Sequence, residues 1–239
     1  SELVRDAPDV LVAPPSVLRY LADEKIGIKF RRIVSVAEVL TPLDRATIER
    51  YFQTTVHQFY TSTEGEIAAT CEHGTLHLNE EIMVVEKEWI DEERTMFHPI
   101  ISDFKRKTQP MIRYRQNDIL VLSKEPCPCG DARQAIAEIL GRQDDVFEFE
   151  STSGNKELVV PDLIRRATMG LHSGITAYMV EQVSPSNIVV QLQPHLSNLD
   201  FSGFEQLWEA KEIVPPEISV ESYDFTPSAT KMRRISKQF

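Results

Sequence analysis

The first sixty residues alternate between short apolar runs and helical patterns, and this alternation restricts the fold more than any other feature of the sequence. Apolar runs at residues 10–13, 31–36 and 56–60 are separated by two segments of helical periodicity. Ser16 is placed to cap the first helix, and the second is expected over residues 41–51, where it begins at a Thr-Pro pair. Strand–helix–strand alternation of this length predicts an α/β layer whose strands run parallel.

Two of the expected strand ends are followed by residues that suit a nucleotide. Glu38 comes after the strand at residues 31–36, and the run FYTSTEG at residues 59–65 closes the next strand. Ligands of parallel sheets usually bind beyond the carboxyl ends of the strands. The run offers an aromatic ring for a base, hydroxyls for phosphate oxygens and a carboxylate for Mg²⁺. Because Ser/Thr/Gly turns also connect strands without any further role, the run gains its weight from later motifs.

From residue 68 onward the pattern changes to short β segments, which predict an antiparallel β subdomain over residues 68–140 beside the α/β layer of residues 1–67. Residues 74–78 and 82–85 are expected to pair as a hairpin. Further strands are expected at residues 100–103, 111–114 and 119–122. Residues 1–142 are thus predicted to form the larger of two domains.

Residues 143–239 are predicted to form a separate, small α+β domain, with the boundary at Arg142 to Asp145. Its strands are expected at residues 146–149, 177–183, 188–193 and 218–223, and its helices at residues 161–171 and 201–211. The predicted fold class is therefore α/β, with a parallel-sheet part, an antiparallel β subdomain and a small α+β C-terminal domain.

The chain is acidic, and its composition excludes several functions. It carries 26 Lys and Arg against 37 Asp and Glu, a net charge of −11, which argues against a general nucleic-acid surface. No apolar run approaches the roughly 20 residues that a membrane helix requires, and the N-terminus lacks the layout of a signal peptide. Three cysteines do not suit a disulfide framework and fit a reducing compartment. We therefore expect a cytoplasmic protein that binds neither nucleic acid nor membrane.

Three later motifs carry residue types that suit nucleotide chemistry. Asp118, in YRQND, is placed to accept both hydroxyls of a ribose, or to cap a turn. Arg142, in GRQDD, is placed to reach a sugar or phosphate, or to form an interdomain salt bridge. Lys231, in TKMR, suits the neutralisation of transferring phosphates, although a charged tail is its ordinary explanation.

Taken in this order, the motifs resemble the C-terminal portion of the adenylate-forming (AMP-binding) ligase superfamily. Residues 60–64 are similar to its aromatic-x-x-Thr-Glu signature, and residues 114–118 to its Tyr-x-x-x-Asp ribose motif. Residues 141–145 are similar to its Gly-Arg-x-Asp hinge, and residues 230–233 to its Gly-Lys-x-Arg segment. The runs PMIRYR and CPCG resemble the phenylacetate–CoA ligase-like branch, which includes deazaflavin-coenzyme adenylating synthetases. The resemblance spans essentially the whole chain.

The resemblance implies how this chain would hold the nucleoside. Tyr60 would stack on adenine, with Ala37 and Glu38 on the other side of the base. Asp118 would hold the ribose hydroxyls, with Arg142 beside them.

The resemblance also implies roles around the phosphates. Thr63 would bind the α-phosphate and Glu64 would ligate Mg²⁺. Lys231 would bridge the carboxylate and the phosphate during adenylation, and Asp144 would be the hinge about which the small domain turns as a lid between half-reactions.

The sequence departs from the family pattern at three places. A glycine- and hydroxyl-rich loop for the β- and γ-phosphates, which the family carries N-terminal to the region matched here, is absent from these residues. Gln116 and Asn117 replace small residues before the ribose aspartate, and Thr230 replaces a glycine before the lysine. The chain is therefore expected to be either part of a longer ligase or a relic that no longer adenylates.

Two short Cys/His groups predict a structural zinc site. Cys71 with His77, and Cys127 with Cys129, supply four ligands on two close spacings, with His73 as the alternative to His77. Related ligases carry a similar arrangement. Four protein ligands leave no open position, so the role would be to hold the β subdomain rather than to catalyse. Free thiols beside a surface histidine are the alternative.

Three functions agree with these features. The first is a ligase that activates an aryl or acyl acid with ATP and Mg²⁺ to an acyl-AMP and passes it to CoA, a carrier protein or another thiol. The second transfers AMP to a hydroxyl of a cofactor, and the third is a nucleotide-binding relic. The expected partners are a small carboxylate and a nucleotide. The sequence leaves open which acid is used and whether the chain forms a homodimer.

Overall fold

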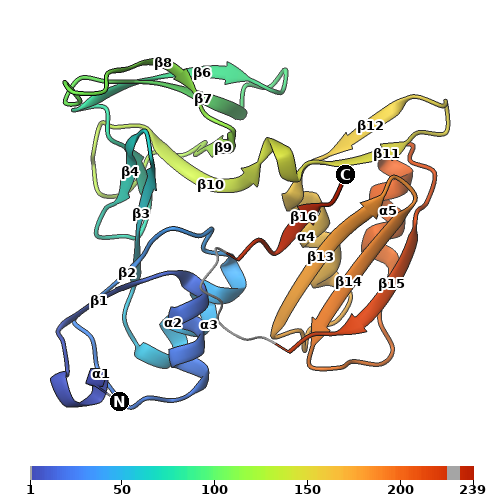
Figure 1. The fold of residues 1–239 in the computed structure, drawn as a ribbon, viewed down its shortest axis with the longest axis horizontal. Helices are drawn as coiled ribbons and strands as arrows, with labels where there is room; N and C mark the ends of the chain where they lie inside the picture. The colour runs from blue at the N-terminus through green and yellow to red at the C-terminus, as the bar shows by residue number, and fades with distance from the viewer. Residues whose placement is uncertain (1, 225–231) are drawn as a thin grey trace. The chain divides into compact units, whose positions relative to one another are not determined.

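The computed structural model of the chain describes residues 2–224 and 232–239, which fall into two compact units. The first unit contains residues 2–139 and Met232, and the second contains residues 140–224 and 233–239. The predicted domain boundary at Arg142 to Asp145 stays a prediction. Figure 1 shows the elements of both units.

The N-terminal part of the first unit is the predicted parallel α/β layer. Strands β1 and β2 pair in parallel, and β2 pairs in parallel with the first half of β3. Leu18, Ile33 and Ile48 are fully buried between the helices and these strands. The elements are α1 (Glu2–Asp6), β1 (Val10–Ala13), α2 (Pro15–Asp23), β2 (Arg32–Ser35), α3 (Pro42–Phe52) and β3 (Val56–Ser62).

The starts of the two helices differ from each other. Thr41 caps α3, because its hydroxyl accepts a hydrogen bond from the backbone N–H of Asp44 at 3.2 Å. The expectation that Ser16 caps α2 is wrong: the N-cap is Pro14, and Ser16 lies inside the first turn. The carboxylate of Glu38, from outside the helix, takes the place of the cap by accepting a hydrogen bond from the backbone N–H of Ser16.

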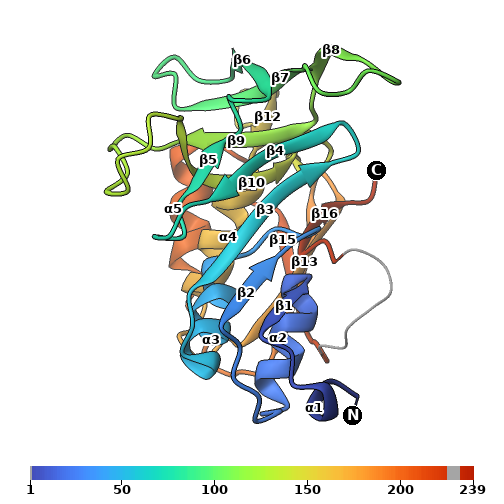
Figure 2. The same cartoon turned by 90° about the vertical axis from the view of Figure 1, so that its left-hand side faces the viewer.

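The second half of β3 turns the sheet antiparallel. The sheet continues in the order β3-β4-β5-β10-β9-β7-β6, and β8 pairs with β7 (Figure 2). Ile67, Phe97 and Leu120 form part of its buried core. The strands are β4 (Gly65–Thr70), β5 (Leu76–Leu78), β6 (Met83–Trp89), β7 (Met96–Asp103), β8 (Met111–Arg115), β9 (Asp118–Leu122) and β10 (Ala135–Arg142).

The predicted hairpin of residues 74–78 with 82–85 is wrong. Strand β5 pairs with β4 and β10, and β6 pairs with β7. Asn79 explains why the chain leaves β5: its side-chain amide donates to Glu66 O and its backbone N–H to Ile67 O. These hydrogen bonds of the buried Asn79 hold the residue after β5 against β4, and β6 then pairs with β7 instead of β5.

The second unit has the predicted α+β pattern. A four-stranded sheet in the order β15-β14-β13-β16 is covered on one face by α4 and α5 (Figure 1). In its core, the Trp208 ring meets Phe149 edge to face and lies tilted against Phe204. The sequence did not indicate β12 or β16. The elements are η1 (Gln143–Asp145), β11 (Phe147–Glu150), β12 (Lys156–Val159), α4 (Pro161–Gly170), β13 (Ala177–Ser184), β14 (Asn187–Gln193), α5 (Ser202–Ala210), β15 (Glu217–Ser222) and β16 (Ile235–Lys237).

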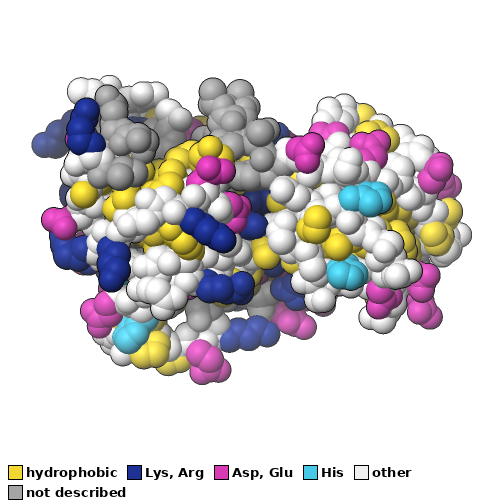
Figure 3. All heavy atoms as spheres, turned by 90° about the horizontal axis from the view of Figure 1, so that it is seen from below, with side chains coloured by type: hydrophobic (Ala, Val, Ile, Leu, Met, Phe, Trp, Pro, Cys, Tyr) yellow, Lys and Arg dark blue, Asp and Glu magenta, His cyan; other side chains and the backbone are white. Residues whose placement is uncertain are grey.

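The surface is mixed in character. On the face drawn in Figure 3, Lys, Arg, Asp and Glu side chains are interspersed with apolar ones. Within the described residues, no helix has both the length and the apolar character needed to cross a membrane.

Candidate functional site

The predicted nucleotide motif forms the turn between β3 and β4. Thr63 and Glu64 are the two turn residues, and Ser62 pairs with Gly65 across the hairpin. The Ser62 hydroxyl accepts a hydrogen bond from the backbone N–H of Glu64 at 3.2 Å. A Cβ atom at Gly65 would lie 3.2 Å from Met83 Cε and 3.4 Å from an Asp103 carboxylate oxygen, so a larger residue here would require the Met83 side chain to shift. The turn is therefore held closely against the neighbouring β strands.

Tyr60 and Asp118 meet although 58 residues separate them. The Tyr60 hydroxyl donates to Asp118 Oδ2 at 2.5 Å. Tyr60 packs against the core of the β region, next to a register shift in the β3–β4 pairing, where Tyr60 pairs with Ala68 but Thr61 with Glu66. Asp118 opens β9 at a break between β8 and β9, which both pair with β7. The predicted base-stacking ring and the predicted ribose carboxylate thus lie side by side.

The Glu64 carboxylate lies close to the same break between β8 and β9, because Tyr114 and Gln116 act on it. Burial by itself raises the pKa of Glu64, but hydrogen bonds from Ser62, its own backbone N–H, Gln116 and Tyr114 outweigh burial and hold the pKa below its ordinary value. The carboxylate is therefore ionised at neutral pH, the form that binds a cation. Gln116 is only 5% exposed, and its amide nitrogen makes no hydrogen bond of ordinary length and angle. The contact of this amide with the Glu64 carboxylate is therefore longer or less well aligned than an ordinary hydrogen bond.

The lowered pKa of Glu64 predicts a specific acid response. A carboxyl group whose pKa is lower in the folded than in the unfolded state contributes stability above the unfolded pKa, and loses it as the pH falls through the folded pKa. We expect Glu64→Gln to remove that part, which for a partly exposed group is below about 1 kcal/mol. Urea unfolding between pH 6 and pH 3 measures it. The free energies of unfolding of wild type and Glu64→Gln should converge as the pH falls. Glu66→Gln, on the neighbouring strand, is the matched control. Parallel pH curves for wild type and Glu64→Gln would contradict the assignment.

Glu38 is occupied at the start of α2. Its carboxylate accepts hydrogen bonds from the backbone N–H of Ser16 at 3.2 Å, the Ser16 hydroxyl at 3.1 Å and the backbone N–H of Met232 at 3.1 Å. A carboxylate at a helix N-terminus is favoured by the helix dipole. Ala37, beside it, is exposed with a φ of 70°. Contact of Ala37 and Glu38 with a base stays a prediction.

The remaining predicted residues lie in the second unit or outside the described residues, so their roles stay predictions. Arg142, the last residue of β10, and Asp144, in η1, are exposed and lie in the second unit. Lys231, the predicted catalytic lysine, lies outside the described residues. The structure therefore brings together Tyr60, the Thr63–Glu64 turn and Asp118.

The predicted metal ligands come together in the first unit. The ligand atoms of Cys71, His77, Cys127 and Cys129 all lie within 4.8 Å of one another. Two Sγ atoms, of Cys71 and Cys127, are 3.7 Å apart, and Cys129 Sγ is 3.5 Å from His77 Nε2. Tetrahedral zinc with ordinary Zn–S and Zn–N bonds requires edges of roughly 3.8 and 3.6 Å. The donor set therefore fits zinc, and His77 rather than His73 belongs to it.

Hydrogen bonds around these ligands also suit a cation. His77 is fully buried, and its Nδ1 lies 3.0 Å from the Arg133 carbonyl oxygen, which leaves Nε2 facing the thiols. A hydrogen bond from Thr75 lowers the pKa of Cys127 to about 6. For Cys129, the backbone N–H of Asp131 lowers the pKa, but burial and the neighbouring thiols raise it to about 11. Thiolates this close repel one another unless a cation lies between them.

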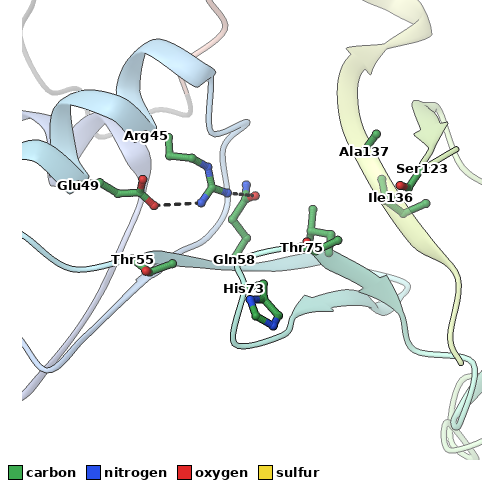
Figure 4. A pocket seen from close by; sticks show the side chains of 11 residues that line it. Arg45, Glu49, Thr55, Gln58, His73, Thr75, Ser123, Ile136 and Ala137 are labelled. Atoms are coloured by element: carbon green, nitrogen blue, oxygen red, sulfur yellow. Dashed lines mark hydrogen bonds and ion pairs between the residues drawn. The ribbon is translucent and has the colours of Figure 1, made fainter. Parts of the chain in front are cut away.

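A separate polar pocket of about 560 Å³ lies beside the loop between Cys71 and His77 (Figure 4). Arg45 donates to Glu49, to the Val56 carbonyl oxygen and to Gln58, so its charge is used to join α3 to β3. The lining residues are Arg45, Glu49, Thr55, Gln58, His73, Gly74, Thr75, Leu76, Ser123, Ile136 and Ala137.

The sequence did not indicate several residues that contact Glu64 or Asp118. Gln116 and Tyr114, which both act on Glu64, stand inside the predicted ribose motif and had no role assigned. His98, which lies 2.9 Å from the Asp118 carbonyl oxygen, carries no signal in the sequence because it comes from β7, twenty residues earlier. A residue of this kind becomes visible only once strand pairing is known.

The comparisons with known proteins give a consistent fold. No family model matches the sequence. Protein CapK of Staphylococcus aureus is 28% identical over 180 residues, which are 74% of this chain and 39% of CapK. The solved 2-hydroxyisobutyryl-CoA ligase in the postadenylation state with R3-HIB-AMP has a TM-score of 0.73 and 16% identity, over 99% of this chain and 56% of its own.

Two further solved structures agree. The amide bond synthetase McbA from Marinactinospora thermotolerans has a TM-score of 0.62 and 15% identity, over 92% of this chain and 49% of its own. The anthranilate CoA ligase AuaEII with anthranoyl-AMP has a TM-score of 0.57 and 13% identity, over 93% of this chain and 47% of its own. The chain thus spans about half the length of these proteins, and over that span it has the mixed α/β fold of adenylate-forming ligases.

Proposed function

We propose that this chain is the nucleotide-binding part of an ATP-dependent adenylate-forming ligase of the phenylacetate–CoA ligase-like branch. It would activate an aryl or acyl acid as acyl-AMP and pass the acyl group to CoA or another thiol. One observation carries the proposal: the 2.5 Å hydrogen bond from Tyr60 to Asp118, with Glu64 at the same edge of the sheet. Motifs far apart in sequence, which resemble base, ribose and phosphate contacts, meet in one place.

The nucleoside would be held by the Tyr60–Asp118 pair. The half-buried Tyr60 ring offers one face to adenine, and the hydrogen bond fixes that ring in position. Asp118 would accept hydrogen bonds from the ribose hydroxyls, because each of its carboxylate oxygens can accept more than one hydrogen bond. Arg142 would approach the ribose from the small domain.

The phosphates would lie at the β3–β4 turn. Thr63 is exposed and would donate to the α-phosphate, while ionised Glu64 would hold Mg²⁺, which supplies neutralisation of phosphate charge when bound. The small domain would turn about Asp144 and bring Lys231 to the reacting carboxylate and phosphate. Positioning and charge stabilisation are the main requirements of such a transfer.

The Cys₃His cluster would hold a structural zinc ion. Its ligands come from the residue after β4, from the middle of β5 and from the loop before β10, so the ion would fasten three neighbouring strands of the β region. It would have no catalytic task, because all four positions are filled by protein ligands.

Binding of AMP tests the proposal. We expect saturable AMP binding by calorimetry, and a roughly tenfold to hundredfold weaker affinity for Asp118→Asn, because hydrogen bonds to a charged group are lost. Asp9→Asn makes the same change at an exposed site and serves as the matched control. Wild type should also prefer AMP over 2′-deoxy-AMP, and Asp118→Asn should lose that preference. Equal affinity of Asp118→Asn and wild type for AMP would contradict the ribose assignment.

A further inference from the structure

The segment between Asp103 and Asp118 is basic within an acidic chain. It contains no Asp or Glu, whereas the whole chain has a net charge of −11. Its cations are Lys105, Arg106, Lys107, Arg113 and Arg115. Sequence reasoning missed this segment, although a run of fourteen residues without an acidic one is a readable signal.

The five cations divide into two groups. Arg113 and Arg115, on β8, pair with Glu86 and Glu88 of β6 at 2.9 and 2.5 Å, so their charges are used within the sheet. The other three occupy the loop between β7 and β8. In the part of the chain that the structure describes, none of these three makes an ion pair. Their charges face solvent or a ligand.

This loop starts beside the predicted phosphate turn. Asp103 Oδ1 accepts hydrogen bonds from the backbone N–H groups of Lys105 at 2.7 Å and Arg106 at 3.3 Å. The other oxygen of the same carboxylate lies 3.4 Å from the position of a Cβ at Gly65, the residue after Glu64. One side chain therefore separates the loop backbone from the turn. Figure 2 shows the β3–β4 turn and the β7–β8 loop at the same edge of the sheet.

Apolar side chains accompany these cations. Phe104, which opens the loop, and Ile112, on β8, are 64% and 77% exposed, the highest values among the exposed large apolar side chains of the described residues. Cations beside an exposed ring suit a phosphorylated ligand that also carries a flat base, because the ring can contact the base while the cations neutralise phosphate.

We infer that Lys105, Arg106 and Lys107, with Phe104, form a subsite for the diphosphate group of a nucleotide. The inference rests on the proposed function, since it extends the site at Glu64 outward along the phosphates. Two sources carry this chemistry: the β- and γ-phosphates of ATP bound at the turn, and the 3′-phospho-ADP end of CoA.

Charge removal from the loop tests the subsite. The variant Lys105→Gln/Arg106→Gln/Lys107→Gln is compared with Lys25→Gln/Lys29→Gln/Arg31→Gln, which removes the same charge from exposed positions of the same unit. Calorimetry with AMP, MgATP and CoA, at low and at physiological salt, gives the affinities. We expect the loop variant to bind AMP within twofold of wild type and to lose roughly tenfold in affinity for MgATP or CoA at low salt. The control variant should retain all three affinities.

The ligand for which the loop variant loses affinity identifies the source of the diphosphate. A loss for MgATP alone assigns the subsite to the triphosphate, a loss for CoA alone assigns it to the CoA end, and a loss for both supports a shared subsite. Unchanged affinities, equal weakening in the control variant, or a wild type that binds neither MgATP nor CoA would overturn the subsite. Loop-dependent CoA binding without AMP binding would contradict the nucleotide site and leave the subsite standing.

Discussion

The Cys127→Ser variant is expected to lose an equimolar zinc ion and a large part of the stability of the β region. Cys127 Sγ lies 3.7 Å from Cys71 Sγ, and the binding free energy of a structural zinc ion is available to the folded state alone. A loss of roughly 3 kcal/mol or more would lower the Tm by about 10 °C for a chain of this size. Elemental analysis gives the metal content, and thermal unfolding with and without a chelator gives the Tm.

A histidine outside the cluster provides the matched control. His73 is exposed, lies two residues from Cys71 and has its Nε2 atom 3.8 Å from a Glu72 carboxylate oxygen. We expect His73→Ala to have the zinc content and the Tm of wild type. His77→Ala should lose zinc and have a lower Tm, as Cys127→Ser does. Wild-type protein that is free of metal and unfolds at the same temperature in chelator would end the zinc assignment.

Replacing Lys231 by alanine is expected to abolish adenylate formation. The segment TKMR resembles the part of the adenylate-forming ligases that carries the catalytic lysine, and the cation would stabilise charge on the carboxylate and phosphate during transfer. Removing one such group from a preorganised site costs roughly 10²- to 10³-fold in rate. Pyrophosphate exchange by the full-length protein with a panel of aryl and acyl acids measures the adenylation step.

The second half-reaction separates a catalytic loss from a folding loss. Lys231→Ala should still form thioester from a preformed acyl-AMP and CoA, because the lysine would have swung away by then. Lys124→Ala removes an exposed cation from the loop before Cys127 and should leave both steps intact. Adenylation that survives in Lys231→Ala would show that another residue fills this role.

The elements that the sequence predicts well are those whose signal is local. Apolar runs and helical periodicity indicated the parallel layer and the small domain, because residues of one element lie next to one another in the chain. The pairing of β5 was predicted wrongly, because its partner β10 follows almost sixty residues later and the anchor at Asn79 depends on β4. The same long-range pairing, His77 opposite Ala135, places the Cys127–Cys129 loop beside His77.

The candidate site divides in a similar way. Tyr60, Glu64 and Asp118 stand in motifs whose residue types fit nucleotide chemistry, so the sequence identifies them. Glu38 is different, because its carboxylate is committed to Ser16 and Met232, and these partners come from a helix start and from a segment about 190 residues later. No local pattern shows such partners. The basic β7–β8 loop was readable from its charges, but its place beside Gly65 follows from strand register alone.

In the proposed function, one edge of the sheet, formed by Tyr60, Glu64 and Asp118, accepts the adenine nucleotide. A crystal structure of the protein soaked with AMP tests it most directly. We expect adenine against the Tyr60 ring, the ribose hydroxyls on Asp118 and the phosphate at the Thr63–Glu64 turn. AMP bound in the pocket beside Arg45 and Gln58 instead, with the Tyr60–Asp118 edge empty, would contradict it.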